Sequence, residues 1–406
     1  MANSLTSLNP YFWAKEAERS LFVENKALAI ANTTLRNLVA GEGSLVYRNI
    51  ISYPASTTYT PGTDITNQAV SSSSESLSIA TWLASKVTVD DTEKRQSIID
   101  IGTNIAKKMM ADHNNRIEQA VTAEVTNAQW SLDDGNIGGT SGANMSLNTS
   151  NIPQVFIAAD TKLDAIDAPK AGRTAVVGGH FLGLLKLQQA GRNTVFGDGV
   201  NTRGIVTNLF GWDILYSNNL PYYAKLTMAT NPTDADTVTI AGVTFTFKST
   251  LGTTAGNVKI TGSAAATVTN FVAALNAPAT AITEGASAGY VAVSAENAFL
   301  LRDKRRITAV DGTTYLTISG FGDVVVSETL TAAADVWSSQ RQDSLFCVKG
   351  CVDQIVQIPP KIEVVRDPDQ FSDIVKSLLG YGVKTFADGA REMVRVKVAA
   401  NTSDWS

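Results

Sequence analysis

The clearest periodic segment of the chain is residues 90–126. Apolar residues recur every three or four positions over Ile98–Val125, and His113 fills the one polar position of that series. Asp90-Asp91 offers an N-cap, and no proline interrupts the segment. The pattern predicts one uninterrupted helix of about 50 Å, which is long for the core of a small enzyme. We interpret His113 as a packed or interface histidine.

A different pattern precedes this helix, in residues 44–89. Leu45–Ile51 is rich in β-forming residues, and Leu77–Leu83 alternates apolar and polar positions with a period of two. The segment between them, 53–75, is polar and includes four consecutive serines. We expect a hairpin with an overlong loop. Such a hairpin is marginal by itself and needs a partner surface.

Most of the remaining chain alternates helical and strand patterns, with a glycine-rich loop expected at 131–150. Capping and apolar spacing predict helices at 9–40, 152–166, 181–187 and 371–379, the last ended by Gly380. Short runs of β-forming residues predict strands at 174–177, 205–208, 212–216, 345–348, 353–357, 361–365 and 394–398. This alternation is typical of an α/β part.

Residues 224–342 differ in composition, because threonine, alanine, valine and glycine predominate there. Two pairs of strands are expected, at 238–247 around Ala241-Gly242 and at 307–318 around Asp311-Gly312. One helix is expected where apolar residues at 268–275 have spacings of three and four. We expect a small α+β domain inserted into the α/β part.

Composition narrows the classes of function. The 406 residues carry a net charge of -5, so the chain is not a basic sheath wrapped on nucleic acid, although a container around nucleic acid needs no such charge. Cys347 and Cys351 are its two cysteines, so it is not a disulfide scaffold and a reducing compartment fits. We find no leader and no membrane span, and expect a chain that is cytosolic when made.

Few residues carry a pattern of catalytic chemistry. His180 follows two glycines at a strand-to-helix turn, but no nucleophile motif surrounds it. Cys347 and Cys351 have no second Cys/His pair to complete a zinc site, and we expect two buried thiols on adjacent strands. Asp133-Asp134-Gly135 is interpreted as a turn, not a calcium loop. The basic cluster at 302–306 is interpreted as an exposed turn that could touch nucleic acid or an acidic neighbour.

The order of elements resembles the Hong Kong 97-type fold of tailed-bacteriophage capsid proteins. It consists of an N-terminal helix, a long hairpin, a long helix, an α/β part with an insertion, and closing strands. Four segments resemble coat proteins of the podovirus type: 77–126, Gly172–Val177, the Gly-Trp-Asp-Ile-Leu-Tyr-Ser-Asn-Asn-Leu-Pro sequence at 211–221, and a closing turn at Gly380–Lys384. The resemblance covers roughly 1–222 and 343–406.

This resemblance implies an α+β fold with five parts. They are an N-terminal arm at 1–43, an extended E-loop hairpin at 44–89, a peripheral domain with a spine helix at 90–150, an axial domain plus closing peripheral strands at 151–223 and 343–406, and an inserted β-rich α+β domain at 224–342.

The resemblance also implies a function. The chain would be a major capsid protein without enzymatic activity, cofactor or metal, forming hexamers and pentamers of an icosahedral shell. That shell would assemble in the cytoplasm of a host bacterium and enclose the double-stranded DNA of a tailed phage without sequence-specific binding. The resemblance also implies scaffolding, portal and decoration proteins as partners. It implies no contact with a membrane.

Exposed aromatic residues favour interfaces. The candidate contacts between subunits are Trp13, Tyr53, Tyr59, Trp82 and His113. Some relatives cross-link subunits through a lysine of the E-loop, but residues 45–85 contain no lysine and Lys86 lies near the base. We therefore predict no isopeptide cross-link in this chain.

Two alternatives stay open. One is the shell protein of an encapsulin-type bacterial compartment, which shares the fold and needs a site for a cargo peptide. The other is an α/β hydrolase or carbohydrate-binding protein that uses 224–342, which activity of His180 and a small monomeric mass would support.

Overall fold

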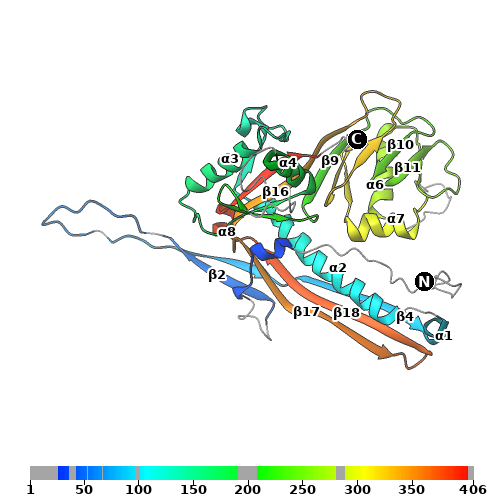
Figure 1. Cartoon of the computed structure of the whole chain (residues 1–406), viewed down its shortest axis with the longest axis horizontal. Coiled ribbons are helices and arrows are strands. Elements are labelled where there is room, and N and C mark those ends of the chain that lie inside the picture. Colours follow the sequence, from blue (N-terminus) through cyan, green and yellow to red (C-terminus); the bar gives the residue numbers. More distant parts are fainter. Residues whose placement is uncertain are drawn as a thin grey trace. The chain divides into compact units, whose positions relative to one another are not determined.

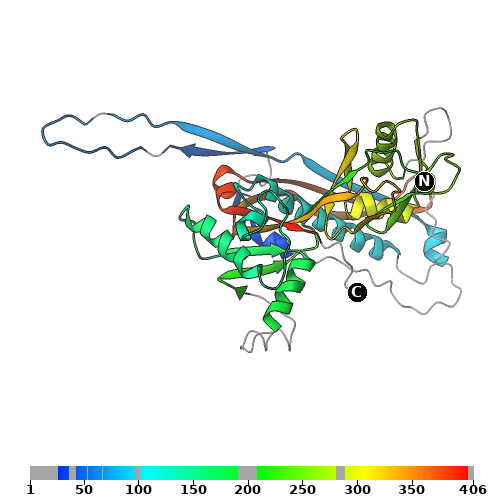
Figure 2. The same cartoon turned by 90° about the horizontal axis from the view of Figure 1, so that it is seen from above.

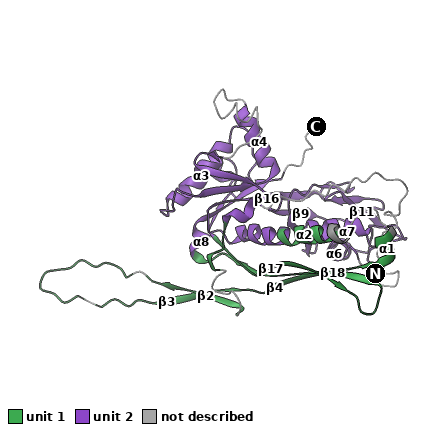
Figure 3. Cartoon of the chain, turned by 60° about the horizontal axis from the view of Figure 1, so that its bottom comes forward, with its two compact units in different colours: residues 1–21, 31–114, 352–387 green, residues 22–30, 115–351, 388–406 purple. Residues whose placement is uncertain are grey.

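The computed structural model describes residues 26–35, 43–52, 54–65, 67–96, 101–190, 208–279 and 289–400. The chain forms two compact units, shown in Figure 3. Unit 1 comprises residues 1–21, 31–114 and 352–387, and unit 2 comprises residues 22–30, 115–351 and 388–406. Much of the helix predicted at 9–40 lies outside the described residues. Within them the prediction is wrong, because Lys26–Ile30 is a 3-10 helix (η2) and Ala31–Asn32 a short strand (β1).

Unit 1 is built around a four-stranded sheet in the order β1-β17-β18-β4. Its long strands are antiparallel neighbours, namely β17 (Val352–Arg366), β18 (Ser372–Lys384) and β4 (Thr81–Asp90). The two strands predicted at 353–357 and 361–365 are the single strand β17. Its register with β18 shifts on both sides of Ile358, next to two prolines that cannot donate to the ladder.

The prediction of a helix at 371–379 is wrong. Its apolar residues have helical spacing, yet the segment is strand β18, hydrogen-bonded to β17 on one side and β4 on the other. Val375 and Leu379 are buried whereas Lys376 and Leu378 are exposed, which is the alternation of a strand. Pairing with two distant strands decided the conformation against the local pattern. The Gly380–Lys384 segment therefore continues the strand and is not a closing turn.

The helix predicted at 90–126 is present in parts. Asp91–Gln96 forms α1 and Ile101–Ala123 forms α2, and residues 97–100 lie outside the described residues. The predicted cap is confirmed, because Asp90 Oδ1 accepts a hydrogen bond from Thr92 N at 2.8 Å. The last predicted turn is the 3-10 helix Glu124–Asn127 (η4). At 1.5 Å per residue, α2 is about 35 Å long.

Unit 2 contains a nine-stranded sheet with the main order β13-β14-β9-β16-β6-β8-β7. Strand β16 (Trp337–Val348) is central in it. On one side β16 pairs first with β9 (Pro221–Thr227) and then with β6 (Arg173–Val177), and on the other side with β19 (Met393–Ala399). The other strands are β5 (Trp130–Leu132), β7 (Asn208–Leu209), β8 (Trp212–Tyr216), β13 (Thr308–Asp311) and β14 (Tyr315–Phe321).

Several predictions for this unit are confirmed. The strands predicted at 174–177, 212–216, 345–348 and 394–398 are β6, β8, the end of β16, and β19. The helices predicted at 152–166 and 181–187 are α3 (Ile152–Asp164) and α4 (Gly179–Ala190). Of the strand predicted at 205–208, residues 205–207 lie outside the described residues. The loop predicted at 131–150 also holds the end of β5 and a 3-10 helix, Asp134–Ile137 (η5).

An aromatic core lies between these helices and the sheet. Phe156 of α3 and Trp212 of β8 both meet Phe346 of β16, with ring centroids 5.3 Å and 5.2 Å apart. All three side chains are fully buried. Edge-on packing of this kind adds to the energy of burial. The core therefore holds α3 on the central strand.

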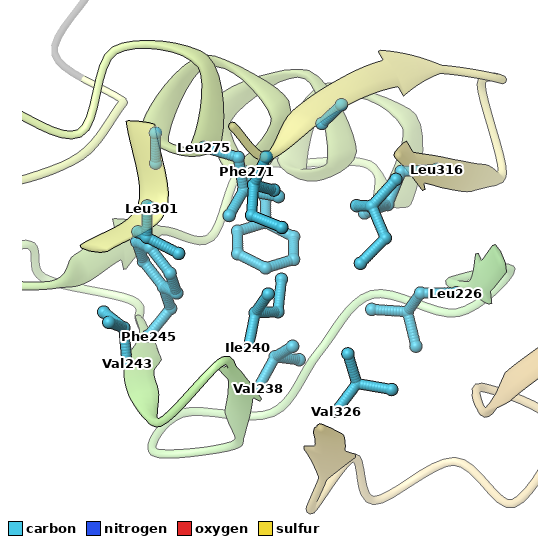
Figure 4. Packing of buried hydrophobic residues seen from close by; sticks show 14 of the residues in the cluster. Leu226, Val238, Ile240, Val243, Phe245, Phe271, Leu275, Leu301, Leu316 and Val326 are labelled. Carbon is cyan, nitrogen blue, oxygen red and sulfur yellow. The ribbon is translucent and has the colours of Figure 1, made fainter. Parts of the chain in front are cut away.

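A second sheet of unit 2 lies within the region of distinct composition. It has the order β12-β11-β10-β15, formed by Asn257–Lys259, Val243–Lys248, Thr237–Ile240 and Val326–Glu328. Helix α6 (Ala264–Asn276) packs on it through Phe271, whose ring lies 5.4 Å from those of Phe245 and Phe247, in the cluster that Figure 4 shows. Three short helices complete the unit: α7 (Ala295–Phe299), the π-helical turn Leu300–Lys304 (η6) and α8 (Ala387–Arg391).

Both hairpins predicted in this region are confirmed, but they belong to different sheets. The 238–247 pair is β10 and β11 of the second sheet. The 307–318 pair is β13 and β14, which continue the large sheet beside β9. The predicted helix is α6, whose start is capped by the Ser263 hydroxyl accepting from Ala266 N.

Candidate functional site

The hairpin of unit 1 is formed by β2 (Leu45–Ile51) and β3 (Ser72–Ser78), which pair residue by residue from Leu45↔Ser78 to Ile51↔Ser72. Figures 1 and 2 both show it running away from the sheet of its own unit. The predicted hairpin with an overlong loop is therefore confirmed, with a connection of twenty residues, 52–71.

The base of the hairpin is anchored in unit 1. Val46 and Leu77 are buried in a small cluster with Ile355 and Phe386. Arg48 of β2 lies over the Phe386 ring, 5.5 Å from its centroid. Lys384 Nζ donates to the Ser76 carbonyl oxygen at 2.6 Å. These contacts fix where the hairpin leaves the sheet.

The outer part of the hairpin has the opposite character. Every described residue from 51 to 74 is exposed. Large apolar side chains lie among them, since Ile65 is 77% exposed and Ile51 65% exposed. Backbone bonds such as Ser52 N to Ser71 O, at 2.9 Å, hold its two strands together. The outer part of the hairpin is thus a mostly polar ribbon that carries a few large apolar side chains in water.

The predicted contact residues have different surroundings. Tyr59 lies in the exposed part of the hairpin and is 59% exposed, and Trp82 on β4 is 51% exposed. His113 is buried in unit 1, where its Nε2 lies 2.8 Å from Ser377 Oγ of β18. It is therefore a packed histidine. Trp13 and Tyr53 lie outside the described residues.

The sequence reasoning missed a buried polar cluster in unit 2. Glu118 of α2 is fully buried, and its carboxylate accepts hydrogen bonds from the backbone N–H of Ala27 at 2.9 Å and from Ser217 Oγ at 3.2 Å. Asn219 Nδ2 donates to the same carboxylate and to Asn115. Burial raises the pKa of Glu118, while these hydrogen bonds to the carboxylate act in the opposite direction. The cluster joins η2 and α2 to the Ser-Asn-Asn-Leu-Pro segment.

One sequence signal could have indicated this cluster. Ser217 and Asn219 belong to the Ser-Asn-Asn-Leu-Pro segment that carries the resemblance, and Leu220 and Pro221 beside them are buried. A polar run followed directly by buried apolar residues indicates that its polar groups have protein partners. Nothing in the sequence indicates that the partner is Glu118.

The other candidates for chemistry have ordinary surroundings. His180, at the start of α4, is half-buried, and burial lowers its pKa while Asp323 acts in the opposite direction. Cys347 in β16 and Cys351 just before β17 are buried free thiols, as predicted. The hydrogen bond with Cys347, together with burial, raises the pKa of Cys351. Among the described residues, no group of three or more His, Cys, Asp or Glu side chains could hold a metal ion.

The structure changes the interpretation of the basic cluster at 302–306. Arg302 and Lys304 are exposed, but Arg305 and Arg306 are half-buried, so this is not simply a solvated turn. Burial lowers the pKa of Arg305, and Asp323 opposes this effect.

Of the helices that the structure describes, none is long and apolar enough to cross a membrane.

No family model matches the sequence, and no curated protein matches it significantly. Solved structures do. A chain from Mycobacterium phage Che8 is 13% identical, with a TM-score of 0.57, covering 95% of this chain and 96% of that one. The capsid structure of the cyanophage P-SCSP1u contains a chain 12% identical, with a TM-score of 0.55 and coverages of 99% and 96%.

A third chain comes from the asymmetric unit of the bacteriophage PhiM1 mature capsid. It is 12% identical, with a TM-score of 0.50, and the alignment covers 95% of this chain and 91% of that one. At such low identity a likeness in structure defines the fold and nothing finer. The chain therefore has the mixed α+β fold of Hong Kong 97-type capsid proteins, as predicted from the order of its elements.

Proposed function

We propose that the chain is the major capsid protein of a tailed phage. Its copies form hexamers and pentamers of an icosahedral shell around the double-stranded DNA. The observation that carries this proposal is the likeness in fold over nearly the whole chain to chains of phage capsids. The match covers 99% of this chain and 96% of the other, so the likeness is not confined to one part of either chain.

The parts of the chain have distinct roles in this proposal. Residues 1–43 are the arm, 44–89 the E-loop, and 90–150 the peripheral domain with α2 as its spine helix. The axial domain and the closing peripheral strands are 151–223 and 343–406, and 224–342 is an inserted domain. The second sheet, β12-β11-β10-β15, lies wholly within 224–342 and supports the insertion.

The exposed hairpin supports assembly. Its outer part places apolar side chains such as Ile51, Tyr59 and Ile65 in water. Burial on another copy would remove that surface from water at about 25 cal/mol per Å². Contacts in which one surface meets a different surface of the next copy close into rings where the rotation between copies completes a full turn. We therefore propose Tyr59 and Trp82 as contacts between subunits, and Trp13 and Tyr53 stay predictions.

The same proposal covers the other partners. A net charge of -5 suits a container that encloses DNA without reading its sequence. Scaffolding, portal and decoration proteins would complete the particle. The encapsulin and hydrolase alternatives have no specific observation in their favour among the described residues.

The test is assembly of the full chain. The chain is expressed alone and with candidate scaffolding protein, then analysed by size-exclusion chromatography with light scattering and by negative-stain microscopy. Capsomers or megadalton shells are expected. A 43.1 kDa monomer under all these conditions, with hydrolytic turnover, would contradict the proposal. Shells purified from cells with a cargo enzyme and no DNA would favour the encapsulin alternative.

A further inference from the structure

We propose that an arginine-lined pocket in unit 2 binds a phosphate group. The pocket has a volume of about 360 Å³, near the lower end for ligand sites. Residues with positive or hydroxyl groups line much of it, namely Arg116, Arg302, Arg306, Tyr223, Thr308 and Ser319. None of the described residues that line it is acidic.

The arginines come from segments that are far apart in the sequence. Arg116 belongs to α2, Arg302 to η6, and Arg306 to the residues that lead into β13. Guanidinium groups present planar pairs of donors that match the oxygens of phosphate, so three of them around one small pocket form a strong anion site.

The structure holds these arginines in place. Arg306 has a φ of 49°, a conformation that L-residues rarely adopt, and its guanidinium lies over the Phe321 ring at 5.8 Å. Arg302 donates to the Asn276 carbonyl oxygen. Arg116 Nη2 lies 3.1 Å from Asp303 Oδ1, so part of its charge is neutralised. The exposed guanidinium of Arg302 therefore supplies attraction that Arg116 does not.

Hydroxyl groups add neutral donors. Thr308 of β13 and Ser319 of β14 are cross-strand partners whose hydroxyl oxygens lie 2.7 Å apart. Both line the pocket. Each hydroxyl can donate one hydrogen bond, and either can turn toward a bound oxyanion.

The aromatic residues of the pocket favour phosphate over a nucleobase. Binding of bases usually requires an open aromatic face for stacking. Here Arg341 lies 4.7 Å and Arg395 5.7 Å from the centroid of the Tyr223 ring. The guanidinium of Arg306 likewise lies over the ring of Phe321. The ligand is thus a phosphate group recognised without its base, either in a small polyphosphate or in the backbone of a nucleic acid.

The test is calorimetric titration of the full chain with pyrophosphate at low ionic strength. Saturable binding of one pyrophosphate per chain is expected. Arg302→Gln should weaken pyrophosphate binding at least tenfold, because it removes one guanidinium from the pocket. Arg302 is exposed, so this replacement should leave the fold intact. Arg306→Gly should weaken binding as well, and glycine is the residue that adopts the positive φ of this position most readily. Arg391→Gln, which removes an exposed arginine of α8 outside the pocket, is the matched control and should bind normally.

A labelled single-stranded deoxythymidine 12-mer distinguishes the two sources of phosphate. If pyrophosphate displaces it and Arg302→Gln weakens it, the pocket also accepts nucleic-acid backbone. If Arg302→Gln weakens the binding of pyrophosphate but leaves the binding of the 12-mer unchanged, small polyphosphates are the ligand. No saturable binding of pyrophosphate, or equal losses in Arg302→Gln and Arg391→Gln, would overturn the proposal. The proposal would also be overturned if pyrophosphate did not bind and Arg302→Gln changed the self-association of the chain. The pocket would then hold a carboxylate of a second copy.

Discussion

The indole ring of Trp82 lies over Gly380, its partner across the β4–β18 pair. A Cβ on Gly380 would overlap the ring, so an alanine there must displace it. Because the ring is 51% exposed and can move aside, we expect Gly380→Ala to lower the free energy of unfolding by about 0.5–1 kcal/mol, measured by urea denaturation. Gly262→Ala is the control, because a Cβ at Gly262 meets nothing within 4 Å. Equal effects of the two substitutions would contradict this account of the β4–β18 contact.

Loss of Tyr59 or Trp82 should impair assembly more than folding. Both side chains are more than half exposed in the single chain, so Tyr59→Ala and Trp82→Ala should each change the free energy of unfolding by less than about 1 kcal/mol. The yield of shells or capsomers, measured by light scattering, should fall severalfold. Phe299→Ala removes an aromatic ring of α7 that is 55% exposed and should assemble normally. Normal assembly of all three variants would remove Tyr59 and Trp82 from the contact surface.

Arg173 should be a strong determinant of stability in unit 2. Its side chain is 2% exposed, and it pairs with Asp160 and, at 2.6 Å, with Asp164. It also donates to the carbonyl oxygens of Ala168 and Pro169. Arg173→Ala removes a buried guanidinium whose carboxylate partners are partly exposed, and it leaves the two carbonyl oxygens without their donor. A loss of about 2–3 kcal/mol is therefore expected in urea denaturation.

Lys170→Ala provides the matched control for Arg173. Lys170 pairs with the same Asp164 at 3.1 Å, but its side chain is 76% exposed. Because water screens such a pair, its removal should cost less than about 1 kcal/mol. A loss as large as that of Arg173→Ala would show that Asp164, not burial of the guanidinium, governs stability there.

Glu118 should make unit 2 less stable as pH rises. Burial raises the pKa of Glu118 above its ordinary value of 4.5, so the folded state holds the proton to higher pH than the unfolded state does. Its contribution to the free energy of unfolding should therefore fall as pH rises from about 4.5 to the folded-state pKa, by at most about 1.4 kcal/mol per pH unit. Glu118→Gln should remove this slope, whereas Glu296→Gln, at an exposed position of α7, should keep it. An unchanged slope in Glu118→Gln would contradict the assignment.

Assembled particles should contain no isopeptide cross-link. Residues 45–85 contain no lysine, and Lys86 lies in β4, where it pairs with Lys376 across the sheet. Denatured particles should therefore give a single species of 43.1 kDa in mass spectrometry and gel electrophoresis. A covalent ladder would show that another lysine is used.

Several parts of the fold were predictable from the sequence because local patterns and tertiary contacts agree. Phe271 and its neighbours have helical spacing, and α6 buries that face on β10 and β11. The alternation of Leu77 and Ile79 marks residues that are buried at the base of the hairpin. The overlong connection between β2 and β3 was also visible, because its polar composition predicts no buried strand.

Other features depend on residues that are distant in the sequence. The segment at 371–379 has helical spacing, yet its pairing with β4 and β17 makes it a strand. Glu118 lies on α2 like any polar helix residue, and only the approach of Ala27 and Asn219 makes it a buried acceptor.

The arginine-lined pocket depends on such approach as well. The sequence shows the cluster at 302–306, but Arg116 lies nearly two hundred residues earlier and reaches the pocket from α2. The sequence by itself determined helices such as α6 and the exposed hairpin, because those follow from local spacing and polarity. Only the tertiary structure decided which backbone groups of β18 found partners and which charges gathered around one pocket, because these depend on contacts across the whole chain.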